Sequence, residues 1–356
     1  MVLSTLSKWS PLPQAPPPFE PASFPYLLLT SGPLKLLLYH LYHLSTYLRT
    51  PLSSVFEPRV RVVCISDTHE LTLDEGKLPG GDILIHAGDL TNSGSIQEIQ
   101  KQVDWLNSLP HRHVVVIAGN HDTYLDPRTR PSLPEDQRTG SINWQRVHYL
   151  QHSSLTLKIS PQRPTSSSSQ DPLLSSSSSS SSPSTRTLRL YGAPQIPACG
   201  PQSTFAFQYP SDADAWSETV PANTDILITH TPPKCHLDLT LPDGLGCKHL
   251  MVEVQRVKPV LHVFGHVHWG AGTTVCWWDG CLDAYRKGMD VGIGWTWGLL
   301  SPTLWWSLGK LVFSGLKELA WDKVWGGQRR STVMVNAAQM KGNTGKLGNP
   351  VQVVDI

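Results

Sequence analysis

The sequence is poor in charge and in cysteine, and it lacks a long uninterrupted apolar run. Charged residues make up 16% of the 356 residues, and 29 Lys and Arg nearly balance 28 Asp and Glu. About 25% charge is usual in soluble domains, and a neutral balance gives no electrostatic reason to expect nucleic acid as a specific partner. Six cysteines without a C-x-x-C pair are too few for a disulfide scaffold and favour a reducing, cytoplasmic location. The composition excludes a collagen, a coiled coil and a polytopic membrane protein, but it leaves membrane association open.

The first 58 residues differ in composition from the rest of the chain. Residues 1–25 are rich in proline and lack the basic start and apolar core of a secretory signal. Residues 33–48 follow with leucines at helical spacing, namely Leu34, Leu37, Leu38, Leu41 and Leu48. Two interpretations of this segment are open: a helix packed on the domain that follows, or an interfacial membrane anchor.

From residue 59 onward the pattern is that of an α/β domain. Short β-branched segments that end at glycine or polar residues predict strands, at 59–66, 82–87, 113–118, 187–192, 225–229, 260–265, 273–278, 331–337 and 350–356. Helices are predicted at 96–109, where Ser95 and Glu98 form a capping-box pair, and at 247–257. This succession of strands and helices indicates an α/β sandwich.

Two insertions interrupt the α/β pattern. Residues 161–186 contain a run of eight serines, which has nothing to bury and predicts a disordered surface loop. Residues 279–330 are rich in Trp, Gly and Leu, with a helical stripe of Leu304, Leu308, Leu311, Val312 and Leu319. This second insertion is interpreted either as an interfacial membrane element over 291–325, the preferred alternative, or as a hydrophobic cap on the domain.

Five short motifs follow predicted strands and carry the chemistry. They are Asp67-Thr68-His69, Gly88-Asp89, Gly119-Asn120-His121-Asp122, Thr229-His230 and Gly265-His266-Val267-His268. Because strand ends converge on one edge of such a sheet, these side chains are expected to meet. Carboxylate, imidazole and amide ligands suit Mn, Fe or Zn. Seven side chains are too many for one ion and fit two ions, about 3.5–4 Å apart, that share a carboxylate.

The pattern D-x-H, G-D, G-N-H-D, H, G-H-x-H resembles the calcineurin-like metallophosphoesterases. The segments GDILIHAGDLTNSGS, LPHRHVVVIAGNHD, LYGAP, DILITHTPP and VKPVLHVFGHVHWGAG are similar to those of metallophosphoesterase-domain proteins from animal brain and their fungal relatives. Those proteins are similar in turn to class III cyclic-nucleotide phosphodiesterases. The resemblance covers 59–278 and 331–356, and it implies a four-layer αββα sandwich of two mixed sheets flanked by helices, in one domain over 59–356.

The resemblance also implies a role for each motif residue. Asp67, His69 and His268 would hold one divalent ion; Asn120, His230 and His266 would hold the other; and Asp89 would bridge the two. A metal-bridging hydroxide would attack phosphorus in line with the leaving oxygen. His121 would stabilise the transition state or protonate the leaving group, and Asp122 would orient His121. Some animal relatives carry Gly at the position of His266, so the complete set here implies an active enzyme.

The predicted function is metal-dependent hydrolysis of a phosphate ester, with a phosphodiester, and a cyclic nucleotide first, as the expected small-molecule substrate. Two alternatives stay open at this point. One is a phosphomonoesterase or protein phosphatase, because the family uses the same metals for both reactions. The other is a non-catalytic adaptor recruited to a membrane, with contact through 33–48 and 291–325. The sequence makes no prediction of oligomeric state.

Overall fold

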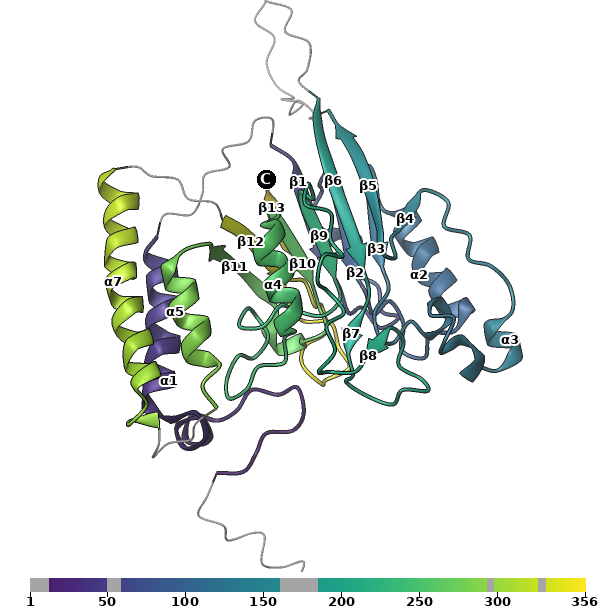
Figure 1. Ribbon diagram of the computed structural model, residues 1–356. Helices are drawn as coiled ribbons and strands as arrows, with labels where there is room; N and C mark the ends of the chain where they lie inside the picture. Colours follow the sequence, from purple (N-terminus) through teal and green to yellow (C-terminus); the bar gives the residue numbers. More distant parts are fainter. Residues whose placement is uncertain (1–12, 50–58, 161–184, 293–297, 326–330) are drawn as a thin grey trace, which may run out of the picture.

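The computed structural model describes residues 13–49, 59–160, 185–292, 298–325 and 331–356 (Figure 1). In this part of the chain, two large mixed β-sheets lie face to face, with helices on their outer sides. The predicted α/β class and its two mixed sheets are therefore confirmed. The serine-rich segment predicted to be a disordered loop falls, except for its last two residues, outside the described residues, as do residues 1–12 of the proline-rich start.

The first sheet has the strand order β13-β1-β2-β3-β4. Its strands are β1 (Arg61–Ile65), β2 (Ile83–Ala87), β3 (His113–Ile117), β4 (Val147–Tyr149) and β13 (Gln352–Asp355). The first four run parallel, and β13 lies antiparallel to β1 at the edge. The parallel strands are almost completely buried, as their continuous Val and Ile runs require.

The second sheet has the order β11-β12-β10-β9-β6-β5. Its strands are β5 (Ser153–Ile159), β6 (Arg186–Ala193), β9 (Ile226–Thr229), β10 (Leu261–Phe264), β11 (Gly272–Trp277) and β12 (Ser331–Asn336). The four central strands run parallel, and β5 and β11 close the two edges antiparallel. A separate short pair consists of β7 (Ile196–Pro197) and β8 (Gln208–Tyr209).

Apolar side chains fill three layers between these elements. The central layer joins the two sheets, for example Ile85 and Ile117 of the first with Ile228 and Val263 of the second. A second layer packs helix α2 (Ile96–Ser108) on the first sheet, and the expected capping box of Ser95 is present. A third packs α4 (Lys248–Val257) on the second sheet. The order is thus helix, sheet, sheet, helix.

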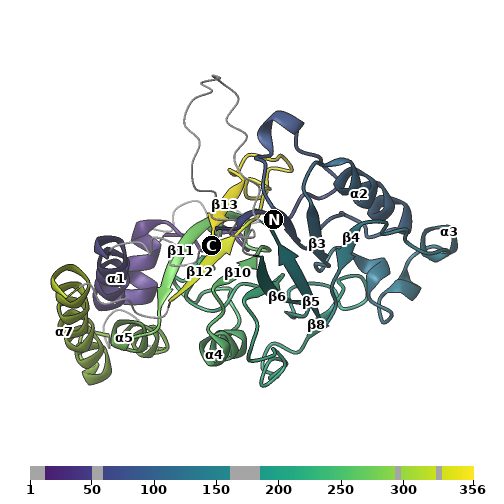
Figure 2. The ribbon, with the colours of Figure 1, turned by 90° about the horizontal axis from the view of Figure 1, so that it is seen from above.

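Three helices from distant parts of the chain form a group beside the edge strand β11 (Figures 1 and 2). They are α1 (Phe24–Leu48), α5 (Gly280–Met289) and α7 (Pro302–Val324); the short α3 (Glu135–Arg138) lies elsewhere. Leu38 and Tyr42 of α1 join the core against Tyr285 of α5. The interpretation of 33–48 as a helix packed on the domain therefore agrees with the structure. Among the described helices, none is long and apolar enough to cross a membrane.

Both predicted apolar stripes of this helix group are divided between core and surface. In α1, Leu38 is buried whereas Leu37 is exposed. In α7, Leu304 and Leu311 are buried, but Val312, which was expected on the same stripe, is exposed. The buried side of α7 is completed instead by serines. Sequence periodicity thus located the helices but misjudged which faces they bury.

Candidate metal centre

The predicted site residues follow the carboxyl ends of strands from both sheets. Asp67 and Asp89 each lie two residues beyond their strands, β1 and β2, and Asn120 lies three beyond β3. In the second sheet, His230 directly follows β9, and His266 comes two residues after β10. The ends of parallel strands share one edge of a sheet, so the two sheets together place the five motifs around one point.

Three overlapping groups of side chains offer ligand atoms that lie within 4.8 Å of one another. The groups are Asp67, His69 and His268; Asp89, His230 and His266; and His69, Asp89 and His121. Carboxylate oxygens and imidazole nitrogens at this spacing suit borderline divalent ions such as Mn, Fe or Zn. The structure therefore brings the predicted residues into clusters that could bind metal ions.

Asp89 belongs to two of these groups, and through His69 it adjoins the group of Asp67 and His268 as well. Its Oδ2 atom is 3.3 Å from His230 Nε2 and 3.7 Å from His69 Nε2. The Asn120 side-chain oxygen is 3.0 Å from the same His230 nitrogen, which joins this amide to the second group. On the other side, His268 Nε2 is 3.3 Å from Asp67 Oδ1. A single carboxylate within reach of both groups is the arrangement that two neighbouring ions need.

Backbone carbonyls fix the orientation of two of the histidine rings. The Nδ1 atom of His230 lies 2.9 Å from the Ala87 carbonyl oxygen, and that of His268 lies 2.9 Å from the Gly342 carbonyl oxygen. Because a carbonyl oxygen can only accept, each Nδ1 carries the hydrogen and donates it. In the neutral form of each ring the lone pair is therefore on Nε2, which points at the carboxylates, as in metal-binding histidines.

Two other buried histidines hold the loops that carry these groups. His86 Nε2 is 2.9 Å from the hydroxyl of Thr68, between the first two ligand candidates. His262 Nε2 is 2.9 Å from the hydroxyl of Thr229, which precedes His230. Neither histidine belongs to a group that could hold metal. Their contribution is to position residues beside the site.

The backbone is strained at the site. Four of the candidate residues have a left-handed backbone, with φ of 52° at Asp67, 45° at His69, 53° at Asp89 and 67° at His266. Residues other than glycine rarely adopt this conformation, and it costs of the order of 1–3 kcal/mol each. Such strain concentrates where geometry serves function rather than stability.

Close approach explains the glycines of two motifs. A Cβ atom on Gly119 would lie 2.2 Å from Asp89 Oδ1, and one on Gly265 would lie 2.2 Å from Asp67 Oδ2. Any side chain at these positions would push a carboxylate out of place. The glycines therefore let the loops after β3 and β10 close over the two aspartates.

The charges of the site depend on one another. Burial alone would raise the pKa of Asp67 and Asp89, but His268 and His230 outweigh it, so both pKa values lie below the usual one. Burial would lower the pKa of His230, yet the charge of Asp89 raises it to about 9. Burial and then the charge of His230 lower the pKa of His266 to about 3. Two buried carboxylates thus attract positive charge, and divalent ions fit that requirement.

His121 is partly buried and lies beside His69. Its ring centre is 4.9 Å from that of His69, and its Nδ1 is 2.9 Å from the Asn92 carbonyl oxygen. Its backbone N–H donates to Asp89 Oδ1 at 2.8 Å. The chain thus ties the His121 backbone to the shared carboxylate, and the residue stays partly exposed.

The expectation that Asp122 orients the His121 ring is wrong. The Asp122 carboxylate accepts hydrogen bonds from the Gly119 N–H at 2.8 Å and from the Thr91 hydroxyl at 2.8 Å. Burial and then the charge of Asp89 raise the pKa of Asp122 to about 6. The residue instead fastens the loop after β3 to the loop after β2, and the Asn92 carbonyl holds the ring.

Phe19 is a site residue that sequence reasoning missed. It comes from the N-terminal extension, and its ring stands nearly perpendicular to that of His266, with centres 5.2 Å apart. Both residues line a cavity of about 390 Å³, together with Cys199, Thr231, Lys234 and Lys248. No local pattern marks Phe19, because its role arises only from a contact between remote parts of the chain. The cavity gives the metal centre an adjoining space with two cationic side chains.

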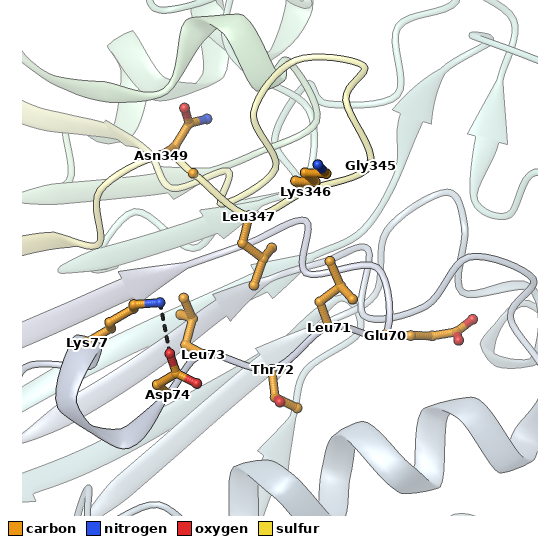
Figure 3. A pocket seen from close by; sticks show the side chains of 11 residues that line it. Glu70, Leu71, Thr72, Leu73, Asp74, Lys77, Gly345, Lys346, Leu347 and Asn349 are labelled. Atoms are coloured by element: carbon orange, nitrogen blue, oxygen red, sulfur yellow. Dashed lines mark ion pairs between the residues drawn. The ribbon is translucent and has the colours of Figure 1, made fainter.

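A larger cavity of about 660 Å³ lies between residues 70–77 and 345–349 (Figure 3). None of the candidate ligands lines it. In Figure 3, Leu347 points toward the 70–77 segment, where Lys77 pairs with Asp74 at 2.8 Å. Asn349, on its wall, donates to the His268 carbonyl oxygen at 3.0 Å. The wall of this cavity thus contacts the site through Asn349, whereas the candidate ligand His266 lines the cavity at Phe19, which is the better candidate for substrate.

The fold and the site together define an α/β sandwich protein with clustered side chains at its strand ends that could bind metal ions. A family model described as calcineurin-like phosphoesterase matches residues 60–270. The chain belongs to this family, as the motifs predicted, and the family uses a dinuclear centre of divalent metal ions.

Three relatives illustrate how far the similarity extends. A protein of Emericella nidulans named probable rhamnogalacturonate lyase C is 40% identical over 286 residues, which are 80% of this chain but 23% of that protein. A UPF0046 protein of Caenorhabditis elegans is 36% identical over 62% of this chain and 73% of its own length. The human metallophosphoesterase domain-containing protein 1 is 36% identical over 60% of this chain and 61% of its own length. The chain thus spans about a quarter of the first relative.

Proposed function

We propose that the protein hydrolyses a phosphate ester at a centre of two divalent metal ions. In this proposal Asp67, His69 and His268 hold one ion, Asn120, His230 and His266 hold the other, and Asp89 is shared. The observation that carries the proposal is the position of the Asp89 oxygen, within 3.7 Å of His69 and 3.3 Å of His230. Donor type fits Mn, Fe or Zn but does not select among them.

In the proposed reaction, the metal ions and the side chains of the protein have different tasks. Two divalent ions supply positive charge for the phosphate and lower the pKa of water, so that hydroxide is available near neutral pH. We assign the leaving group to His121, whose backbone is tied to Asp89 and whose Nδ1 lies against the Asn92 carbonyl. With Nδ1 so engaged, Nε2 is the nitrogen that would pass a proton to the leaving oxygen.

The substrate class that we propose is a phosphodiester, with a cyclic nucleotide as the first candidate. The adjoining cavity of about 390 Å³ supports it, because this space exceeds what a phosphate group alone needs. Lys234 and Lys248 line the cavity and suit an anionic ester, and the Phe19 ring offers a flat apolar surface. A phosphomonoester would occupy the metal centre without using this space.

The test compares hydrolysis of bis-p-nitrophenyl phosphate with that of p-nitrophenyl phosphate in the presence of Mn²⁺. We expect faster hydrolysis of the diester by the full chain and loss of activity in Asp89→Ala. The control is Asp74→Ala, which removes an exposed acid on a nearby loop and should leave the rate unchanged.

The other outcomes separate the alternatives. Preference for the monoester would favour a phosphomonoesterase or a protein phosphatase. Absence of metal-dependent hydrolysis of both esters, in a folded and metal-loaded sample, would overturn the proposal and favour the adaptor.

A further inference from the structure

Helix α7 buries two leucines among small and polar side chains and exposes its tryptophans and phenylalanine. Its buried residues are Leu304, Ser307, Leu311, Ser314 and Glu318. On the opposite side, Phe313 is 71% exposed, Trp306 66% and Leu316 65%. The surface helix of a water-soluble domain has the reverse arrangement, with its apolar stripe toward the core. We define the outward face of α7 by its exposed residues Trp305, Trp306, Phe313, Leu316 and Val324. This face is suited to contact with a non-aqueous neighbour.

The buried side of α7 explains why these apolar residues lie outside. A Cβ atom on Gly280 of α5 would lie 2.9 Å from Ser314 Oγ, and one on Gly288 would lie 3.1 Å from Ser307 Cβ. Glycine facing serine lets the two helices approach closely, which is how helices associate where the hydrophobic effect does not drive them together. A large side chain at Ser307 or Ser314 would not fit this contact, and Trp306, Phe313 and Leu316 occupy the other face of α7.

The charged residues of α7 are also divided between its inner and its outer side. Both of its acids turn toward the protein: Glu318 is buried, and Asp322 pairs with the buried Arg49 at 2.7 Å. Lys310 and Lys317 are exposed one helical turn from Phe313, and Lys317 forms a long ion pair with the adjacent Glu318, at 3.9 Å. The outward face is thus apolar with basic residues along its flank. Tryptophan and lysine in this pattern are typical of helices that lie in a lipid interface.

We propose that the outward face of α7 docks the protein on an anionic lipid surface, with the helix lying in the plane of the interface. Phe313 and Leu316 would enter the acyl boundary, while Lys310 and Lys317 would meet the negative headgroups. The charge pattern favours lipid over a second copy of this chain, because antiparallel pairing about Phe313 would bring the lysines of the two copies together. This inference is independent of the proposed hydrolysis and narrows the predicted membrane segment from 291–325 to 302–324.

The experiment is co-sedimentation of the full chain with phosphatidylcholine vesicles that contain or lack phosphatidylserine. We expect binding to the anionic vesicles that decreases with salt. The double variant Lys310→Gln/Lys317→Gln should bind roughly 30-fold more weakly, and Phe313→Ser/Leu316→Ser should abolish binding. Val252→Ser on α4 is the matched control, because this apolar residue is 54% exposed but lies on another helix. Far-UV circular dichroism establishes that each variant is folded.

Three results would overturn the proposal. The first is a full chain that stays in the supernatant with both kinds of vesicle. The second is binding that survives the Phe313→Ser/Leu316→Ser change or is lost equally in Val252→Ser. The third is a dimer in light scattering that the Phe313→Ser/Leu316→Ser variant converts to monomer, since the face would then be covered by a second copy.

Discussion

Arg49 holds the three-helix group together, and its removal should be costly. It follows α1 and is buried, with Nη1 2.5 Å from Asp279 Oδ2 and Nε 2.7 Å from Asp322 Oδ2. Asp279 also caps the start of α5, Asp322 belongs to α7, and the guanidinium group lies 4.0 Å from the centre of the Trp277 ring. One cation therefore links α1, α5, α7 and the end of β11.

Arg49→Met keeps the length of the side chain but leaves two buried carboxylates without their cation. Breaking a buried ion pair by removing one partner costs about 3–5 kcal/mol, since the remaining charges stay desolvated. At about 1.3–2 °C per kcal/mol for a chain of this size, we expect the melting temperature to fall by about 4–10 °C. Urea unfolding followed by tryptophan fluorescence measures the free energy directly.

The matched control is Arg61→Met. Arg61 also pairs with a carboxylate, Asp355 at 2.8 Å, but this pair is exposed, so its loss should cost less than about 1 kcal/mol. The account of this buried cluster is refuted if the free energy of unfolding of Arg49→Met lies within about 1 kcal/mol of that of the unchanged chain. It is also refuted if Arg49→Met loses no more of this free energy than Arg61→Met does.

Three further predictions concern the site and the core. His121→Gln should lower kcat for the diester by about 10²–10⁴-fold with metal content unchanged, and full activity would contradict its role as proton donor. Lys248→Ala should raise KM for an anionic diester and leave kcat nearly constant, whereas an unchanged KM would exclude the cavity at Phe19 as the substrate site. Burial lowers the pKa of His236 and His262 to about 3, so below pH 6.5 the unfolded chain binds more protons than the folded one. Stability should therefore fall between pH 6.5 and pH 4 by roughly 1.4 kcal/mol per pH unit for each histidine, and His236→Gln should flatten this slope in urea unfolding.

Continuous apolar strands were predictable from the sequence, whereas the edge strands β4 and β5 were not. The buried parallel strands β1, β2 and β3 read as short Val and Ile runs that end at the site motifs. The antiparallel edge strand β5 alternates exposed and buried residues along SSLTLKI. Its serines, threonine and lysine weaken the apolar pattern from which a strand is predicted. The strand is held by antiparallel pairing with β6, which the local pattern does not reveal.

The motif residues of the site could be predicted because each follows a strand, but their neighbours could not. Nothing near Phe19 in the sequence indicates its position beside His266. Likewise, Asp122 follows His121 in the chain, yet its carboxylate turns to the loop after β2. The positions of both side chains depend on contacts between segments that are distant in the sequence or follow different strands. Sequence periodicity does not predict such contacts.

The central claim is that Asp89 joins two metal ions in one centre. Its most direct test is electron paramagnetic resonance of the full chain loaded with two equivalents of Mn²⁺, beside Asp89→Asn. The account predicts the spectrum of an exchange-coupled Mn²⁺ pair, which Asp89→Asn replaces with the hyperfine pattern of isolated ions. Isolated Mn²⁺ in the unchanged chain, or coupling that persists in Asp89→Asn, would contradict it.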